Sequence, residues 1–153
     1  MDFRYVWTDG NDAVFQHFYR ITEDYYNTLV GGENNRRSFM PYNLSAMVEG
    51  VLIVWFGEKP VACAGYKRYS KTDAEIKRVW VEPEYRCRHI AAEMMRMLED
   101  RIVSEGFERA ILQTRESMTA AVRLYLNLGY CRIENYPPYD KLGGAVCFAK
   151  QLK

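Results

Sequence analysis

Residues 75–106 read EIKRVWVEPEYRCRHIAAEMMRMLEDRIVSEG, and this stretch decides the fold. Its apolar run at 76–81 predicts a short buried strand, which leads into a turn that contains Pro83. Apolar residues then recur at four-residue steps, a spacing that predicts a helix with one apolar face. They are Ile90, Met94, Leu98 and Ile102. Gly106 stands where this helix is expected to end.

A basic segment, 86–89 (RCRH), separates the predicted strand from the predicted helix. The N–H groups of the first turn of a helix have no intrahelical partners, and the helix dipole adds partial positive charge there. Arg86 and Arg88 add full charges, and a guanidinium can donate two hydrogen bonds to one phosphate. The segment is therefore a candidate phosphate-binding site. The alternative is a solvated basic turn that only caps a structural helix.

Two motifs resemble those of the GCN5-related N-acetyltransferases, the GNAT family. The run E-I-K-R-x-x-V-x-P-x-x-R-x-R-x-I-A at 75–91 is similar to the central motif of the family, whose pyrophosphate-binding signature is R/Q-x-x-G-x-G/A. The run AVRLYLNLGY at 121–130 is similar to the second motif, A-x-x-L-Y-x-x-x-G-F/Y. The tail, at 135–139 and 146–150, resembles the closing strands of one bacterial branch. These motifs lie in the expected order in the C-terminal half of the chain.

The resemblance implies an α/β fold of the GNAT type, a splayed mixed β-sheet with helices on both faces. The pattern of the chain agrees, because strand-like runs lie on either side of one strand–helix–strand unit. Besides 76–81, strands are expected at 3–8, 50–56, 60–69, 109–114, 130–135 and 145–152. Further helices are expected from the Asn11 or Asp12 cap to Gly31-Gly32, at 44–48, and from the Ser117 or Thr119 cap to Gly129. A chain of 153 residues should form a single domain, 1–153.

The resemblance also implies two catalytic residues. Tyr125 stands where the second motif places the tyrosine that approaches the coenzyme sulfur, and a phenol can protonate a departing thiolate. The alternative is that Tyr125 is one more aromatic residue of the core. Glu75 stands where several relatives have a general base. The alternative for Glu75 is a surface carboxylate that pairs with Lys77 or Arg68.

Acetyl-CoA is the cosubstrate that the resemblance implies, and no metal is expected. Backbone N–H groups near Trp80 or Val81 are expected to stabilise the oxyanion and to bind the pantetheine amides. The other residues predicted to bind the coenzyme are Arg86, Cys87, Arg88, His89, Ile90, Ala91 and Thr114.

In the fuller form of the signature the family usually has R-G-x-G-I-G/A, whereas this chain has RCRHIA at 86–91, so Cys87 and His89 replace both glycines. Glycine tolerates a left-handed backbone, in which a Cβ costs on the order of 1 kcal/mol. If either position is left-handed, coenzyme binding is expected to weaken by about tenfold. The imidazole of His89 could compensate by donating a hydrogen bond to a phosphate.

The acceptor is expected to be a small molecule with a primary amine. Arg36 and Tyr42 stand where relatives build the acceptor wall, and Tyr139 is expected on the opposite wall. An arginine there can bind a carboxylate or a phosphate, although it can equally belong to a solvated loop. Two other functions remain open: a non-catalytic acyl-CoA-binding module, which the lost glycines favour, and a peptide or protein Nα-acetyltransferase.

Composition argues against several classes of protein. A formal charge of +1 gives no general attraction to nucleic acid or to an anionic membrane. The sequence shows no signal peptide and no run of ~20 apolar residues, so a cytoplasmic location is expected. The four cysteines are widely spaced, which favours neither a metal site nor a disulfide framework. The apolar run 146–148 could be an edge strand through which a homodimer forms.

Overall fold

A computed structural model describes residues 2–29 and 48–153, with the backbone alone for 23–29. The chain divides into two compact units. Unit 1 consists of Met1–Lys67 and Ile76–Leu98, and unit 2 consists of Arg68–Glu75 and Glu99–Lys153. Strand β4 (Asp73–Val81) and helix α3 (Ile90–Ser104) therefore contribute residues to both units.

The described residues form seven hydrogen-bonded strands in the order β1-β2-β3-β4-β5-β7-β6. Besides β4, they are β1 (Arg4–Thr8), β2 (Gly50–Phe56), β3 (Lys59–Arg68), β5 (Arg109–Arg115), β6 (Cys131–Ile133) and β7 (Ala145–Gln151). The other helices are α1 (Ala13–Leu29), α4 (Thr119–Asn127) and the short 3-10 helices η3 (Pro83–Tyr85) and η4 (Tyr139–Lys141). The sheet is mixed, because β4 and β5 are parallel whereas β5 and β7 are antiparallel. This confirms the predicted fold class; the helix expected at 44–48 lies outside the described residues, except for Val48.

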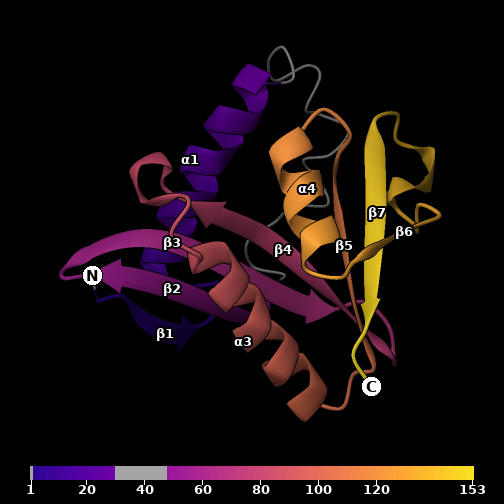
Figure 1. Cartoon of the computed structure of the whole chain (residues 1–153), viewed down its shortest axis with the longest axis horizontal. Helices are drawn as coiled ribbons and strands as arrows, with labels where there is room; N and C mark the ends of the chain where they lie inside the picture. Colours follow the sequence, from indigo (N-terminus) through magenta and orange to yellow (C-terminus); the bar gives the residue numbers. More distant parts are fainter. Residues whose placement is uncertain (1, 30–47) are drawn as a thin grey trace. The chain divides into compact units, whose positions relative to one another are not determined.

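In unit 1, helix α1 begins at a side-chain cap and packs on the sheet. Asp12 Oδ1 accepts hydrogen bonds from the N–H groups of Val14 and Phe15, at 2.8 and 3.1 Å. The buried cluster that α1 forms with the strands comprises Phe15, Phe18, Val48, Val51, Ile53, Cys63 and Trp80. In Figure 1, α3 crosses in front of the strands of unit 1 and α1 passes behind them. The two faces of the sheet therefore carry different helices, as predicted.

Strand β4 begins at Asp73, three residues before the predicted start at residue 76. The apolar pattern of the sequence did not predict this start, because Asp73, Glu75 and Lys77 are charged and nevertheless buried. In unit 2, Asp73 Oδ2 lies 2.8 Å from Nη2 of Arg109, which is its register partner on β5. Charged residues enter a strand interior when partners of this kind satisfy them.

In unit 2, β7 is hydrogen-bonded on both sides. It pairs antiparallel with β5 from Arg109↔Gln151 to Arg115↔Ala145, and with β6 from Cys131↔Ala149 to Ile133↔Cys147. The prediction that the run 146–148 offers a free edge for a homodimer is therefore wrong. The short strand β6 occupies that edge instead. None of the described helices is long and apolar enough to span a bilayer.

Candidate functional site

The segment that joins η3 to α3 has the backbone of a glycine loop. Cys87 and His89 both have a φ of 63°, in the left-handed region. These are the two positions at which the family signature has glycine. The chain therefore keeps the glycine-type conformation although both residues carry a Cβ, which costs on the order of 1 kcal/mol at each.

The N-terminus of α3 leaves backbone donors without partners. The first intrahelical bond runs from the N–H of Glu93 to the carbonyl of His89, at 3.1 Å. Within residues 2–29 and 48–153, the N–H groups of Cys87, His89, Ile90 and Ala91 have no hydrogen-bond partner. Residues 86–89 are exposed to solvent. Exposed donors at a helix N-terminus are suited to bind an anion, and the phosphate-binding role expected from the sequence stays a prediction.

The two arginines of this segment are held differently. Arg86 Nε donates to the carbonyl of Val81 at 2.9 Å, and its guanidinium carbon lies 4.9 Å from the Trp80 ring centroid. The guanidinium carbon of Arg88 lies 5.5 Å from the ring centroid of Tyr85. Arg86 is thus fixed to the end of β4, and both charges stay beside the N-terminus of α3. The sequence identified these charges but not their anchors.

Trp80 and Val81 have buried side chains at the end of β4. The side chain of Trp80 is 7 % exposed and belongs to the buried cluster under α1. Val81 is 9 % exposed, and its carbonyl accepts the hydrogen bond from Arg86. The prediction for both residues concerns their backbone N–H groups, which side-chain burial does not test, so it stays a prediction.

In unit 2, Glu75 is a buried carboxylate with a tyrosine partner. Its side chain is 2 % exposed, and Tyr136 Oη donates to Glu75 Oε2 at 2.7 Å. Burial raises the pKa of Tyr136 well above its ordinary value, and the charge of Glu75 and this hydrogen bond raise it further. Tyr136 therefore stays protonated and keeps donating. The alternative of a surface carboxylate is wrong, because Glu75 is buried.

Three tyrosines of unit 2 pack together beside this carboxylate. The ring of Tyr136 meets Tyr69 and Tyr139 edge-on, with centroid distances of 4.9 and 5.5 Å. The hydroxyl of Tyr69 donates to the carbonyl of Pro137 at 2.6 Å, which fixes the backbone next to Tyr136. Tyr139 is only 1 % exposed, so its ring supports Tyr136 and does not form the surface of a pocket in this conformation. Tyr69 and Tyr136 are half-buried and are the more accessible members.

Tyr125 and Thr114 lie in unit 2 as well. Tyr125 is 7 % exposed on α4, with its ring 6.0 Å from that of Tyr130 and 6.4 Å from that of Phe148. These contacts are those of a core aromatic, so they leave its catalytic role a prediction. Thr114 Oγ1 donates to Met118 Sδ at 3.6 Å. Arg36 and Tyr42, predicted to bind the acceptor, lie outside the described residues.

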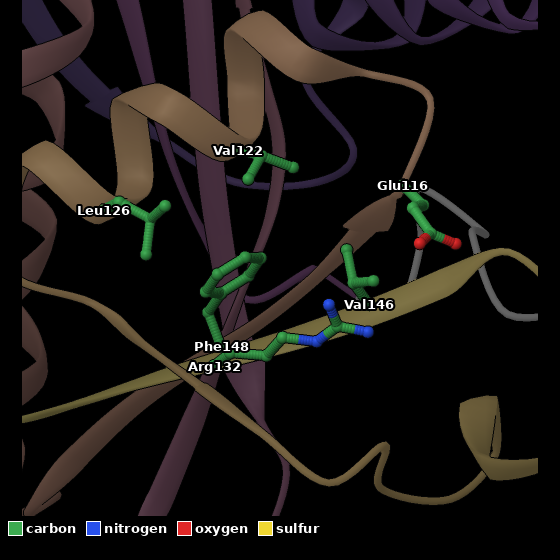
Figure 2. Close-up of a pocket in the computed structure, with 6 residues that line it drawn as sticks. All are labelled: Glu116, Val122, Leu126, Arg132, Val146 and Phe148. Carbon is green, nitrogen blue, oxygen red and sulfur yellow. The ribbon is translucent and has the colours of Figure 1, made fainter.

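Unit 2 also contains a cavity that the sequence did not predict. Its volume is about 250 Å3, and it is lined by Glu116, Val122, Leu126, Arg132, Val146 and Phe148. Figure 2 shows Val122 and Leu126 projecting from α4 over Phe148, with Arg132 running past Val146. No predicted site residue lines this cavity. No sequence signal marked it, because its lining comes from segments that only the fold brings together.

Within the described part of the chain, no three His, Cys, Asp or Glu side chains are grouped as metal ligands. The turn at 86–91 in unit 1, with its two left-handed residues, and the buried Glu75–Tyr136 pair in unit 2 are two candidate chemical features of the described residues.

The model of the Acetyltransferase (GNAT) family matches residues 6–130. The chain belongs to the GNAT family. It is therefore an acyltransferase, and the left-handed Cys87 and His89 occupy the glycine positions of a GNAT signature. The match also covers much of the N-terminal half, where the sequence showed only a compatible pattern.

Solved GNAT structures share the fold across the whole chain. A provisionally assigned acyl-CoA N-acyltransferase from Klebsiella pneumoniae subsp. pneumoniae MGH 78578 is 20 % identical, with a TM-score of 0.82 over 99 % of this chain and 98 % of that one. The PaiA N-acetyltransferase from Thermoplasma acidophilum, in complex with coenzyme A, is 13 % identical, with a TM-score of 0.76 over 99 % of each chain. A GNAT acetyltransferase from Elizabethkingia anophelis with acetyl-CoA bound is 11 % identical, with a TM-score of 0.69 over 97 % of each chain. No curated protein matches the sequence.

Proposed function

We propose that this GNAT acetyltransferase transfers the acetyl group of acetyl-CoA to a primary amine of a small molecule, by direct attack in a ternary complex. The observation that carries the proposal is the turn of unit 1, in which Cys87 and His89 keep the left-handed backbone of the family signature. Two unfavourable conformations beside four N–H groups that have no partner within the described residues are explained if this turn binds a ligand.

The turn fits the pyrophosphate of a coenzyme. The N–H groups of Cys87, His89, Ile90 and Ala91 would donate to phosphate oxygens, and the dipole of α3 favours the negative charge. Arg86 and Arg88 would add charge-assisted hydrogen bonds. The E. anophelis and T. acidophilum structures, which share the fold, hold acetyl-CoA and coenzyme A respectively. Both ligands support this choice of cosubstrate.

Acetyl transfer needs a proton acceptor for the attacking amine, and we assign this role to Glu75. The carboxylate is buried and Tyr136 holds one of its oxygens, so it keeps a fixed orientation. At 2 % exposure, it would take the proton through an ordered water more readily than by direct contact.

The other two requirements are a donor for the oxyanion and an acid for the departing thiolate. Backbone N–H groups near Trp80 and Val81 would stabilise the charge that develops on the thioester oxygen. Tyr125 would protonate the coenzyme thiolate, because it occupies the motif position and a phenol matches a thiolate in basicity.

We propose a small amine as the acceptor and the tyrosines beside Glu75 as part of its binding site, and we keep Arg36 and Tyr42 as further predicted acceptor-binding residues. A buried carboxylate surrounded by Tyr69 and Tyr136 suits an ammonium group, which both a carboxylate and aromatic faces attract. Arg36 would select acceptors that also carry a carboxylate or a phosphate.

Calorimetric titration with acetyl-CoA, CoA and dephospho-CoA tests the coenzyme site. We expect low-micromolar binding of acetyl-CoA and CoA, and binding that survives removal of the 3′-phosphate, because the proposed contacts go to the pyrophosphate. Absence of binding at millimolar acetyl-CoA would contradict the proposal.

Thiol release with a panel of diamines, polyamines, amino acids and aminosugars then tests the reaction. With the best acceptor, Tyr125→Phe should lower turnover by about 100-fold or more and leave coenzyme affinity unchanged. Tyr130→Phe is the matched control, since Tyr130 is a neighbouring buried tyrosine whose hydroxyl donates to Glu99. An unchanged turnover number in Tyr125→Phe would remove Tyr125 from the role of acid.

A further inference from the structure

Strand β4 contains a residue in a conformation that strands ordinarily exclude. Arg78 has a φ of 55°, in the left-handed region, although it carries a long side chain. Such a conformation is unfavourable for any residue with a Cβ, and it persists only where surrounding contacts impose it. Arg78 lies two residues before Trp80, near which the proposed function places the oxyanion donors.

The side chain of Arg78 is held by two residues of α1. Both α1 and Arg78 belong to unit 1. Arg78 Nη1 donates to Thr22 Oγ1 at 3.0 Å, and its guanidinium carbon lies 4.1 Å from the Tyr19 ring centroid. Thr22 is 1 % exposed, and its hydroxyl donates in turn to the carbonyl of Tyr19 at 3.0 Å. Because this threonine is buried and its hydrogen is already used, Oγ1 presents a lone pair to Arg78. We name Arg78, Tyr19 and Thr22 the α1 clamp.

The backbone of Arg78 is held from the other side by β3. The carbonyl of Arg78 accepts a hydrogen bond from Cys63 Sγ at 3.4 Å. Burial raises the pKa of the Cys63 thiol to about 12, so the thiol stays protonated and can donate. A strand carbonyl ordinarily accepts from a backbone N–H of its neighbour, whereas this carbonyl is directed at a side chain.

The orientation of that carbonyl fixes the next N–H group. A peptide bond is planar and trans, so its C=O and N–H point in opposite directions. The carbonyl of Arg78 points toward Sγ of Cys63, and the N–H of Val79 therefore points away from that sulfur atom. A donor fixed in this way needs no reorganisation when charge develops on an oxygen in front of it.

We infer that Arg78 is a positioning residue, which acts with Tyr19 and Thr22 to hold the left-handed turn that directs the Val79 N–H to the thioester carbonyl of acetyl-CoA. This inference rests on the proposed function and names both the oxyanion donor and the side chains that orient it. Acetyl-CoA and CoA differ only in the acetyl group that bears this carbonyl. The clamp should therefore affect the affinity for acetyl-CoA more than the affinity for CoA.

Calorimetric titration of Arg78→Met and Thr22→Val with both ligands tests the inference. Arg78→Met keeps the length of the side chain without its charge and donors, and Thr22→Val keeps the shape without the acceptor oxygen. We expect the Kd for acetyl-CoA to rise about tenfold in Arg78→Met and about threefold in Thr22→Val, with the Kd for CoA changing less than about twofold. Arg4→Met is the matched control, because it removes another guanidinium of unit 1, one stacked 5.7 Å from the Trp55 ring.

Arg78→Gly is a second variant that keeps the test valid if Arg78→Met fails to fold. Glycine adopts a left-handed φ without a clamp. This variant should therefore keep more of the preference for acetyl-CoA over CoA than Arg78→Met or Thr22→Val keeps. An equal loss of both ligands would overturn the inference, because the clamp would then be only structural. An unchanged ratio of the two Kd values would overturn it as well, and a wild-type chain that binds neither ligand would overturn the proposed function along with it.

Discussion

Restoring glycine at Cys87 and His89 should stabilise the folded chain. Both residues have a φ of 63°, both are exposed, and neither side chain has a hydrogen bond or ion pair within the described residues. Removing the thiol and the imidazole should therefore change the free energy of unfolding little. What changes is the conformational energy of the backbone.

The magnitude follows from two opposing terms. A Cβ in the left-handed region costs about 1–2 kcal/mol, at the lower end for histidine, which adopts this region more often than most residues. Glycine adds about 0.5–1 kcal/mol of entropy loss on folding. The net gain is about 0.5–1 kcal/mol at each position, or about 1–2 kcal/mol for the double variant. For a chain of this length that corresponds to about 2–8 °C in Tm.

Urea and thermal unfolding of Cys87→Gly, His89→Gly and the double variant measure this gain. The matched controls are Cys87→Ala and His89→Ala, which remove the same functional groups but keep the Cβ, and these should not be stabilised. Arg88→Gly is a control within the same turn, where φ is not positive, and it should be destabilised by about 0.5–1 kcal/mol.

The reasoning would be refuted if glycine and alanine gave equal stability at both positions. The same variants separate stability from binding. Because the left-handed backbone belongs to the folded chain itself, its cost lowers the free energy of unfolding and not the affinity for the coenzyme. The Kd for acetyl-CoA of the double variant should therefore change by less than about threefold, not by the tenfold that the sequence alone led us to expect.

Three further predictions concern partners that the fold brings together. Asp73→Asn should lower the free energy of unfolding in urea by about 1 kcal/mol, because it weakens the two hydrogen bonds from Arg109 at 2.8 and 3.2 Å. The same substitution should leave the free energy of unfolding unchanged in an Arg109→Met variant. Burial raises the pKa of the Cys63 thiol from 9.0 to about 12, so the thiol ionises at lower pH in the unfolded chain than in the folded one. The free energy of unfolding should therefore fall by about 1.4 kcal/mol per pH unit between these two pKa values. Unfolding measured at pH 8 and pH 10 tests this, and Cys63→Ala should remove this contribution to the pH dependence. Tyr136 is expected to act through Glu75, so the single variant Tyr136→Phe should lower the turnover number, whereas the same substitution made in a Glu75→Gln variant should lower it no further. Losses that add in the double variant would show that the two residues have separate roles.

Local patterns of the sequence were sufficient for the order of the described strands and α-helices, apart from the start of β4, and for the basic segment that precedes α3. The four-residue spacing from Ile90 to Ile102 predicted α3, which is observed at Ile90–Ser104. The Asp12 cap was one of two predicted alternatives, and its hydrogen bonds confirm it. These features depend on residues within a few positions of one another, and such short-range constraints are written directly in the sequence.

Features that depend on distant partners were missed or misjudged. Nothing near Glu75 in the chain indicates that its partner is Tyr136, 61 residues away. The apolar run 146–148 looks like an edge strand until β6 is found hydrogen-bonded beside it. The charges of Asp73 and Glu75 made the start of β4 look like a loop, because periodicity assumes that buried residues are apolar.

The sequence by itself thus determined the family, the order of the elements and the basic charges of the segment 86–89. Only the tertiary structure decided that Cys87, His89 and Arg78 adopt left-handed backbones and that Thr22 and Tyr19 hold Arg78 in place. The physical reason is that sequence patterns report which residues seek burial or a partner. The backbone angle of a strained residue is set by the neighbours that the packed chain supplies, and these lie far apart along the sequence.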